Sequence, residues 1–243
     1  APHNAFTDLI RFRNCWWSAF REAQSHGSHD GAVRVIMSEG GDCWKSATLL
    51  KQDGIDLRDP KLSITPNNYL MLIMGGSIYD SQGVYQTRSP RVAFSQDGYD
   101  WTEPRKLLAE DHWLWRVTWQ GDWAWGVSKL GEGPDPRRCM LYRSRNAFDW
   151  EWVTEFRLPD NTWNASETTL RFLPDGEMIA LTRPHWIGTS RQPYTNWSWT
   201  KIEENIGGPN FICLPDGSLW AAGRHSDGNP TTVLARLSRE SYE

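Results

Sequence analysis

Two ionisable side chains bracket a stretch of the chain that has the form of a β-hairpin. Glu167 stands in the run N-A-S-E-T-T-L-R-F, the letters L-P-D-G follow at residues 173–176, and Arg183 ends the next run. Because an Asp-Gly turn reverses the chain, we expect Glu167 and Arg183 at the same end of adjacent strands. A carboxylate and a guanidinium placed in this way can bind one polar ligand together, or they can form a structural ion pair.

Three more arginines lie where side chains facing a ligand would project. A second L-P-D-G at residues 214–217 precedes Arg224, which therefore corresponds to Arg183 one repeat later. Arg21 stands just before a polar loop, and Arg58 lies in the run D-L-R-D-P. We expect these side chains to bind substrate, with a purely structural role as the alternative for Arg224.

The polar loop at residues 25–31 reads S-H-G-S-H-D-G and contains Asp30. Its histidines, His26 and His29, have the chemistry of metal ligands. Two histidines in one loop are more often solvated, so no metal site is predicted.

Several classes of function are disfavoured by composition. The formal charge of −4 leaves no basic footprint for nucleic acid, and no apolar run approaches the roughly 18 residues of a membrane span. The Gly/Pro segment at residues 131–136 has no phosphate-binding lysine, so neither a nucleotide nor another cofactor is expected. The four cysteines lack zinc-site spacing; free, packed thiols are predicted, and one bridge between Cys15 and Cys43 is the alternative.

A short loop pattern recurs about every 50 residues and divides the chain into similar units. The best copy, S-Q-D-G-Y-D-W, has a serine, an Asp-Gly turn and a tryptophan that is expected to fold back under the turn. The four copies, called the Ser-Trp loops below, are Ser38–Trp44, Ser95–Trp101, Ser144–Trp150 and Ser190–Trp197.

Between these loops each unit carries a β-rich hairpin and a third strand-like run, and another strand follows each loop. Four antiparallel strands in each repeated unit predict an all-β chain with the architecture of a β-propeller. A β-sandwich is the alternative, but it would not explain a loop motif at every repeat.

Five units are recognisable in one domain spanning residues 1–243, and the last lacks its outer strand. A fifth loop begins at Ser238 without reaching a tryptophan. Because an open ring leaves a sheet edge exposed, we expect six blades in the full-length protein, truncated here at the C-terminus. A complete five-bladed ring is the alternative.

The S-x-D-G-x-x-W pattern at Ser95 resembles the Asp box, or BNR repeat, of the sialidase superfamily of six-bladed propellers. In that family the box lies on the outer turn of each blade, away from the active site. The segment from Asn164 to Arg183 is similar to the sialidase stretch in which a glutamate opens an inner strand and an arginine ends the next. The resemblance implies that Glu167 polarises a catalytic tyrosine and that Arg183 grips the substrate.

By the same resemblance, Asp30 corresponds to the acid/base aspartate, which protonates the departing glycosidic oxygen. This sequence differs from the sialidase pattern at two places that affect the expected substrate. Ala5-Phe6-Thr7 stands where sialidases carry Arg-Ile-Pro, and the nucleophilic tyrosine would fall beyond Glu243.

The resemblance therefore implies a sialidase-like glycoside hydrolase that removes a terminal acidic or neutral sugar from a glycan. The sugar need not be sialic acid, and neither metal nor cofactor is implied. The alternative is a non-catalytic propeller that binds glycan or protein. The chain begins at Ala1, which fits a processed or trimmed chain, and a secreted or periplasmic location is slightly favoured.

Overall fold

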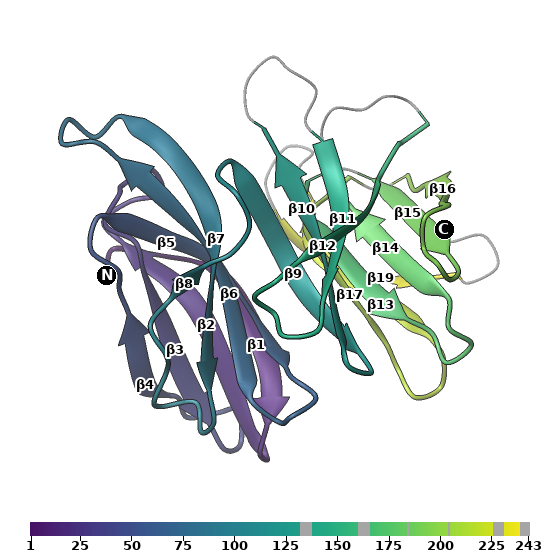
Figure 1. Ribbon diagram of the computed structural model, residues 1–243. Coiled ribbons are helices and arrows are strands. Elements are labelled where there is room, and N and C mark those ends of the chain that lie inside the picture. The colour runs from purple at the N-terminus through teal and green to yellow at the C-terminus, as the bar shows by residue number, and fades with distance from the viewer. Residues whose placement is uncertain (132–137, 160–165, 184, 204, 226–230, 239–243) are drawn as a thin grey trace.

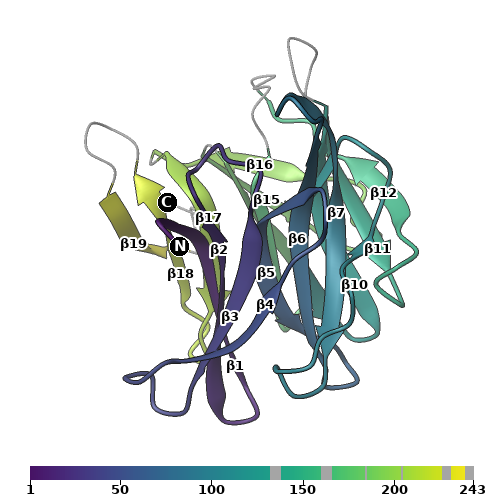
Figure 2. The same ribbon diagram turned by 90° about the vertical axis from the view of Figure 1, so that its left-hand side faces the viewer.

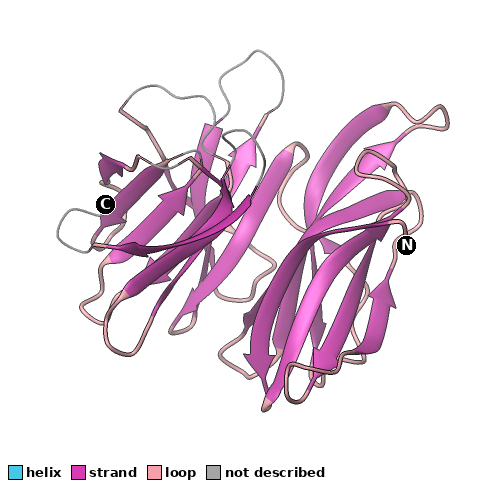
Figure 3. Ribbon diagram, turned by 180° about the vertical axis from the view of Figure 1, so that it is seen from behind, coloured by secondary structure: helices cyan, strands magenta, loops and turns pink. Residues whose placement is uncertain are grey.

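The computed structural model describes residues 1–131, 138–159, 166–183, 185–203, 205–225 and 231–238. The described residues form nineteen strands in five antiparallel sheets, which are the blades of a β-propeller (Figure 1). The described residues consist of strands, turns and loops (Figure 3), and they contain no helix long and apolar enough to cross a membrane. The predicted fold class is confirmed.

Each blade is a meander in which strands that follow one another in sequence pair side by side. Blade 1 comprises β1 (His3–Phe12), β2 (Cys15–Ala23), β3 (Ala32–Ser38) and β4 (Lys45–Leu50). Blade 2 comprises β5 (Ile55–Ile64), β6 (Leu70–Tyr79), β7 (Tyr85–Ser95) and β8 (Arg105–Lys106). Blade 3 comprises β9 (His112–Gln120), β10 (Trp123–Leu130), β11 (Arg138–Ser144) and β12 (Glu151–Glu155).

Blade 4 comprises β13 (Thr168–Phe172), β14 (Met178–Thr182), β15 (Trp186–Ser190) and β16 (Ser198–Lys201). In the described part of the chain, blade 5 has three strands, β17 (Ile206–Cys213), β18 (Leu219–His225) and β19 (Thr231–Leu237), and the outer strand is lacking there, as predicted. The first strand of each blade packs against the first strand of the next, from β1 through β5, β9 and β13 to β17. Figure 2 shows the blades from the side of blade 1. The sixth blade stays a prediction.

Among the described residues, the hydrophobic core consists of four clusters, each filling the space between two neighbouring blades. The sequence of strand β6 is almost continuously apolar, and its position between two blades explains this. Leu70 and Leu72 point toward blade 1, whereas Met71 and Ile73, which alternate with them, point toward blade 3. Successive side chains of a strand face opposite sides, so a blade with neighbours on both faces needs apolar residues at every position.

The guanidinium groups of Arg116, which is buried, and of Arg171, which is half-buried, join blades near their inner strands. Arg116 on β9 donates two hydrogen bonds to the Asp8 carboxylate on β1, at 3.0 and 2.8 Å, and Asp8 also accepts from the backbone N–H of Leu62 on β5 at 2.7 Å. Arg171 on β13 donates to Thr118 Oγ1 on β9 and to Asn210 Oδ1 on β17. Together these contacts connect all five inner strands.

The four Ser-Trp loops share one local geometry. In each, the indole Nε1 donates to the backbone carbonyl three residues earlier, as Trp101 does to Gly98 at 2.8 Å. That earlier residue has a positive φ in every copy: Gly41, Gly98, Ala147 and Tyr194. The expected folding of the tryptophan under its turn is confirmed, and only the first two copies place glycine at the left-handed position.

Candidate active site

A central cavity of about 1010 Å³ lies at the end of the blades where the inner strands β5, β9 and β17 begin. Most of its lining is polar or aromatic, and all five blades contribute. The lining includes Phe6, His26, Arg58, Asp59, Tyr79, Arg88, Trp113, Trp115, Glu167, Arg183, Gly208 and Arg224. Of the residues predicted from the sequence, four therefore meet in one cavity: Arg58, Glu167, Arg183 and Arg224.

Local breaks in strand pairing turn residues into this cavity. The pairing of inner and second strands shifts between Ala5 and Asp8 in β1, between Arg58 and Lys61 in β5, and between Gly207 and Asn210 in β17. Each shift contains a residue with positive φ that lines the cavity: Phe6 (63°), Asp59 (51°) and Gly208 (61°). Such bulges re-aim side chains next to functional sites, and positive φ is costly for residues other than glycine.

Glu167 and Arg183 form the predicted pair. Arg183 Nη1 donates to Glu167 Oε1 at 3.0 Å, and the backbone N–H of Gly208 donates to Oε2 at 2.7 Å. The backbone N–H of Arg183 also donates to the carbonyl of Glu167, which continues the hairpin past the end of β14. Both oxygens of the carboxylate are thus held in place by blades 4 and 5 at the wall of the cavity.

Asp59 provides a second carboxyl group in the cavity, and the sequence did not predict it as a site residue. Burial raises its pKa above the ordinary value, against the opposing effects of Lys61 and Arg58, and the negative charge of Glu167 raises it further. Lys61 is itself buried, and burial lowers its pKa; its Nζ lies 4.4 Å from the ring centroid of Trp115. The cavity therefore holds two carboxyl groups in different environments.

Arg58 and Arg224 are cationic parts of the wall. Arg58 donates to the backbone carbonyl of His26, lies 3.4 Å from the Asp56 carboxylate, and has its guanidinium over the ring of Phe6. Arg224 is exposed and lies beside Gly207, where an added Cβ would come within 3.1 Å of Nη2. An exposed guanidinium at a cavity wall can reorient toward an anionic or hydroxylated ligand.

Arg21 and Asp30 are not among the residues that line the cavity. Arg21 is fully buried, donates to Asp56 Oδ1 at 3.0 Å and to the carbonyls of Ser25 and Ser28, and so braces the polar loop against blade 2. Asp30 is exposed and accepts from the backbone N–H of Gln24. The structure thus separates these two residues from the four that line the cavity.

The polar loop nevertheless reaches the rim of the cavity. His26 lines the wall and stacks against His3, with ring centroids 5.6 Å apart, and His29 packs on Tyr79 at 4.8 Å. Within the described residues, no group of three or more His, Cys, Asp or Glu side chains is arranged to hold a metal ion. All four cysteines are free, so the bridge between Cys15 and Cys43 is absent.

Aromatic side chains of blade 3 complete the wall. Trp113 and Trp115, from a tryptophan-rich run of the sequence, both line the cavity, and the guanidinium of Arg88 lies 5.1 Å from the ring centroid of Trp113. Aromatic faces beside charged groups are suited to a ligand with both C–H and hydroxyl surfaces.

Neither a protein-family model nor a curated protein matches the sequence. Solved structures match it over nearly its whole length. A protein of unknown function from Dyadobacter fermentans is 15% identical with a TM-score of 0.82, and the match covers 98% of this chain and 80% of that one. The α-L-arabinofuranosidase of Fusarium graminearum is 12% identical with a TM-score of 0.74, and the match covers 97% and 77%.

The sialidase of Trypanosoma rangeli is 10% identical with a TM-score of 0.69, and the match covers 90% of this chain and 44% of that one. The predicted resemblance to the sialidase superfamily is confirmed at the level of the fold: the chain is a β-propeller of the kind found in these glycoside hydrolases.

Proposed function

We propose that this protein is a glycoside hydrolase that removes a terminal sugar from a glycan bound in the central cavity. The observation that carries the proposal is the meeting of Glu167 and Asp59, two carboxyl groups with different surroundings, in a cavity walled by arginines and tryptophans. Paired carboxyl groups whose environments separate their pKa values are the usual equipment for acid/base catalysis at a glycosidic bond.

In this proposal Asp59, whose pKa burial raises, donates a proton to the departing glycosidic oxygen. Glu167, whose two side-chain oxygens are held in position by Arg183 and Gly208, stabilises the positive charge that develops at the anomeric carbon or polarises the nucleophile. Arg58, Arg183 and Arg224 bind the hydroxyl or acidic groups of the sugar. Asp30 stays the candidate that the sequence resemblance predicts for the acid/base role.

The substrate class follows from the arginines and from the first blade. Ala5 stands where sialidases carry the first arginine of the carboxylate grip, and the next residue, Phe6, supplies an apolar ring to the cavity, with Arg58 against that ring. The cavity therefore favours a sugar with one face of C–H groups. A terminal sugar other than sialic acid fits this wall better than sialic acid does.

A panel of chromogenic glycosides tests the proposal, with pentofuranosides, hexopyranosides and a sialoside among them. We expect one class to be hydrolysed and Glu167→Gln to lower kcat by about 10²–10⁴-fold. Asp59→Asn and Asp30→Asn show which aspartate is the general acid. The variant that lacks the general acid should lose kcat by the same factor and should still bind the glycoside. Asp100→Asn, an exposed carboxylate on a Ser-Trp loop, is the matched control and should leave the rate unchanged.

A non-catalytic glycan-binding propeller is the second candidate, and the Glu167–Arg183 ion pair favours it, because each group partly neutralises the other. Binding of a glycan without turnover, retained in both Glu167→Gln and Asp59→Asn, would establish this function instead.

A further inference from the structure

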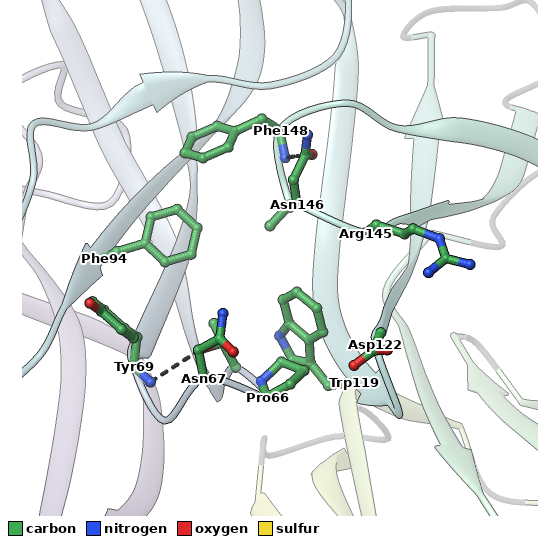
Figure 4. Close-up of a pocket in the computed structure, with 11 residues that line it drawn as sticks. Pro66, Asn67, Tyr69, Phe94, Trp119, Asp122, Arg145, Asn146 and Phe148 are labelled. Carbon is green, nitrogen blue, oxygen red and sulfur yellow. Dashed lines mark hydrogen bonds between the residues drawn. The ribbon is translucent and has the colours of Figure 1, made fainter.

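A second pocket, of about 480 Å³, lies between blades 2 and 3 (Figure 4). It lies at the opposite end of the inner strands from the central cavity, because Arg58 and Trp115 line that cavity whereas Thr65 and Trp119 line this one. The hairpin turns after β5 and β9 and the Ser-Trp loop of blade 3 form its wall. The lining residues on which the binding surface depends are Asn67, Tyr69, Phe94, Trp119, Asp122 and Phe148.

Four aromatic rings line this pocket, and their positions are held by neighbours. Phe94 and Phe148 pack with ring centroids 5.4 Å apart, and the Tyr69 hydroxyl accepts a hydrogen bond from Gln96. Figure 4 shows Tyr69 and Phe94 on one side of the pocket, with Trp119 across from them. The rings are half-buried, so part of each remains open to the pocket. The pocket is thus a preformed aromatic surface.

Polar groups stand beside these rings with hydrogen-bonding capacity to spare. Asn67, Asp122 and Arg145 are exposed. Within the described part of the chain, the side chains of Asn67 and Asp122 form no hydrogen bond or ion pair. The Arg145 guanidinium is steadied by the ring of Trp123 at 4.3 Å, which leaves its N–H groups available. Asn146 differs, since its amide is engaged within its own loop by Phe148 and Asp149.

We propose that this inter-blade pocket is a second, non-catalytic binding site for one neutral sugar unit of a glycan. Aromatic faces pack on the C–H faces of a sugar ring, and the Asp122 carboxylate and Asn67 amide can each bind hydroxyl groups on its edge. Asp122 and Arg145 offset each other in charge, which favours a neutral ligand over an acidic one. The volume is that of a small-molecule site, and the inference does not depend on whether the central cavity is catalytic.

The Trp119 indole provides a local probe of the pocket. Its Nε1 is buried and has no hydrogen-bond partner within the described residues, so its resonance should be sensitive to a ligand packed on the ring. Two-dimensional ¹H–¹⁵N spectra of the full chain, titrated with methyl glycosides of neutral pentoses and hexoses, give one curve per sugar. We expect at least one sugar to shift the Trp119 indole signal with a Kd in the millimolar range.

Matched variants assign the site. Asn67→Ala and Asp122→Asn should each raise the Kd for that sugar by about fivefold or more, because each removes or weakens a hydrogen-bonding group of the pocket. Both residues are exposed and lie outside the core, so the substitutions should not disturb folding. Trp152→Ala, which removes an exposed tryptophan of the outer strand β12, and Glu167→Gln should leave it unchanged. No shift of the Trp119 signal by any sugar would overturn the proposal. A shift that survives both pocket variants, or a shift lost in Trp152→Ala or Glu167→Gln, would overturn it as well.

Discussion

Replacing Asp8 by asparagine removes the charge from a carboxylate that joins three blades. Asp8 and Arg116 are 6% and 8% exposed, so in Asp8→Asn the guanidinium stays buried without its counter-ion. Two charge-assisted hydrogen bonds from Arg116 are weakened, and the backbone N–H of Leu62 faces a poorer acceptor. Breaking one side of a buried pair typically costs 3–5 kcal/mol, and we expect a loss of about 4 kcal/mol in the free energy of unfolding at pH 7.

The assay is urea unfolding monitored by tryptophan fluorescence, with Glu151→Gln as the control. Glu151 pairs with Arg143 at a similar distance of 3.0 Å, but the two side chains are 60% and 39% exposed. Its removal should therefore cost no more than about 1 kcal/mol. The double variant Asp8→Leu with Arg116→Met, which removes both charges, should recover much of the loss. A loss for Asp8→Asn no larger than that for Glu151→Gln would refute the reasoning.

The same pair predicts a pH dependence. Burial raises the pKa of Asp8, but the charge and hydrogen bonds of Arg116, together with the charge of Lys61 and the backbone N–H of Leu62, outweigh this effect, and the pKa lies below its ordinary value. A carboxyl group with a depressed pKa in the folded state stabilises the protein above its unfolded pKa, near 3.9 for aspartate, and loses that contribution as the pH falls through the folded value. The difference in stability between wild type and Asp8→Asn should accordingly narrow below about pH 4.

Three further predictions concern single residues. Gly98→Ala should destabilise the protein far more than Gly54→Ala, as measured by thermal unfolding, because both have positive φ but only at Gly98 would the new Cβ meet the Trp17 ring, at 2.2 Å. Asp59→Asn should raise Tm at pH 7, because the raised pKa of Asp59 in the folded state means that the unfolded state releases this proton more easily, which lowers stability as the pH rises above the unfolded pKa of about 3.9; the gain should vanish below pH 4. Cys139, whose pKa burial raises to about 12, should react with a thiol reagent at pH 8 only on unfolding.

The fold could be predicted from the sequence because its determinants are local and repeated. The serine, the left-handed turn residue and the tryptophan of each Ser-Trp loop are within a few positions of one another, so their spacing reports the blades directly. The L-P-D-G turns place Glu167 and Arg183 at one end of a hairpin for the same reason. Pairings of this kind need no knowledge of how the blades are arranged around the axis.

The rest of the site depends on contacts between distant segments. Arg21 lies near the end of β2, next to the polar loop that reaches the cavity. Its guanidinium is buried and paired with Asp56 of the next blade, so it does not line the cavity. Asp59 sits on a bulge with positive φ, and nothing in D-L-R-D-P distinguishes it from Asp56 as the residue that enters the cavity. Bulge position, unlike turn position, is set by packing between blades.

The dependence of kcat/KM on pH, for whichever glycoside is turned over, tests the central claim most directly. If Asp59 is the proton donor, the rate should fall at high pH through a group whose pKa lies above that of an ordinary aspartate, and the residual activity of Asp59→Asn should lack that limb. The same alkaline limb in Asp59→Asn, or no turnover of any glycoside by the wild-type protein, would contradict the account.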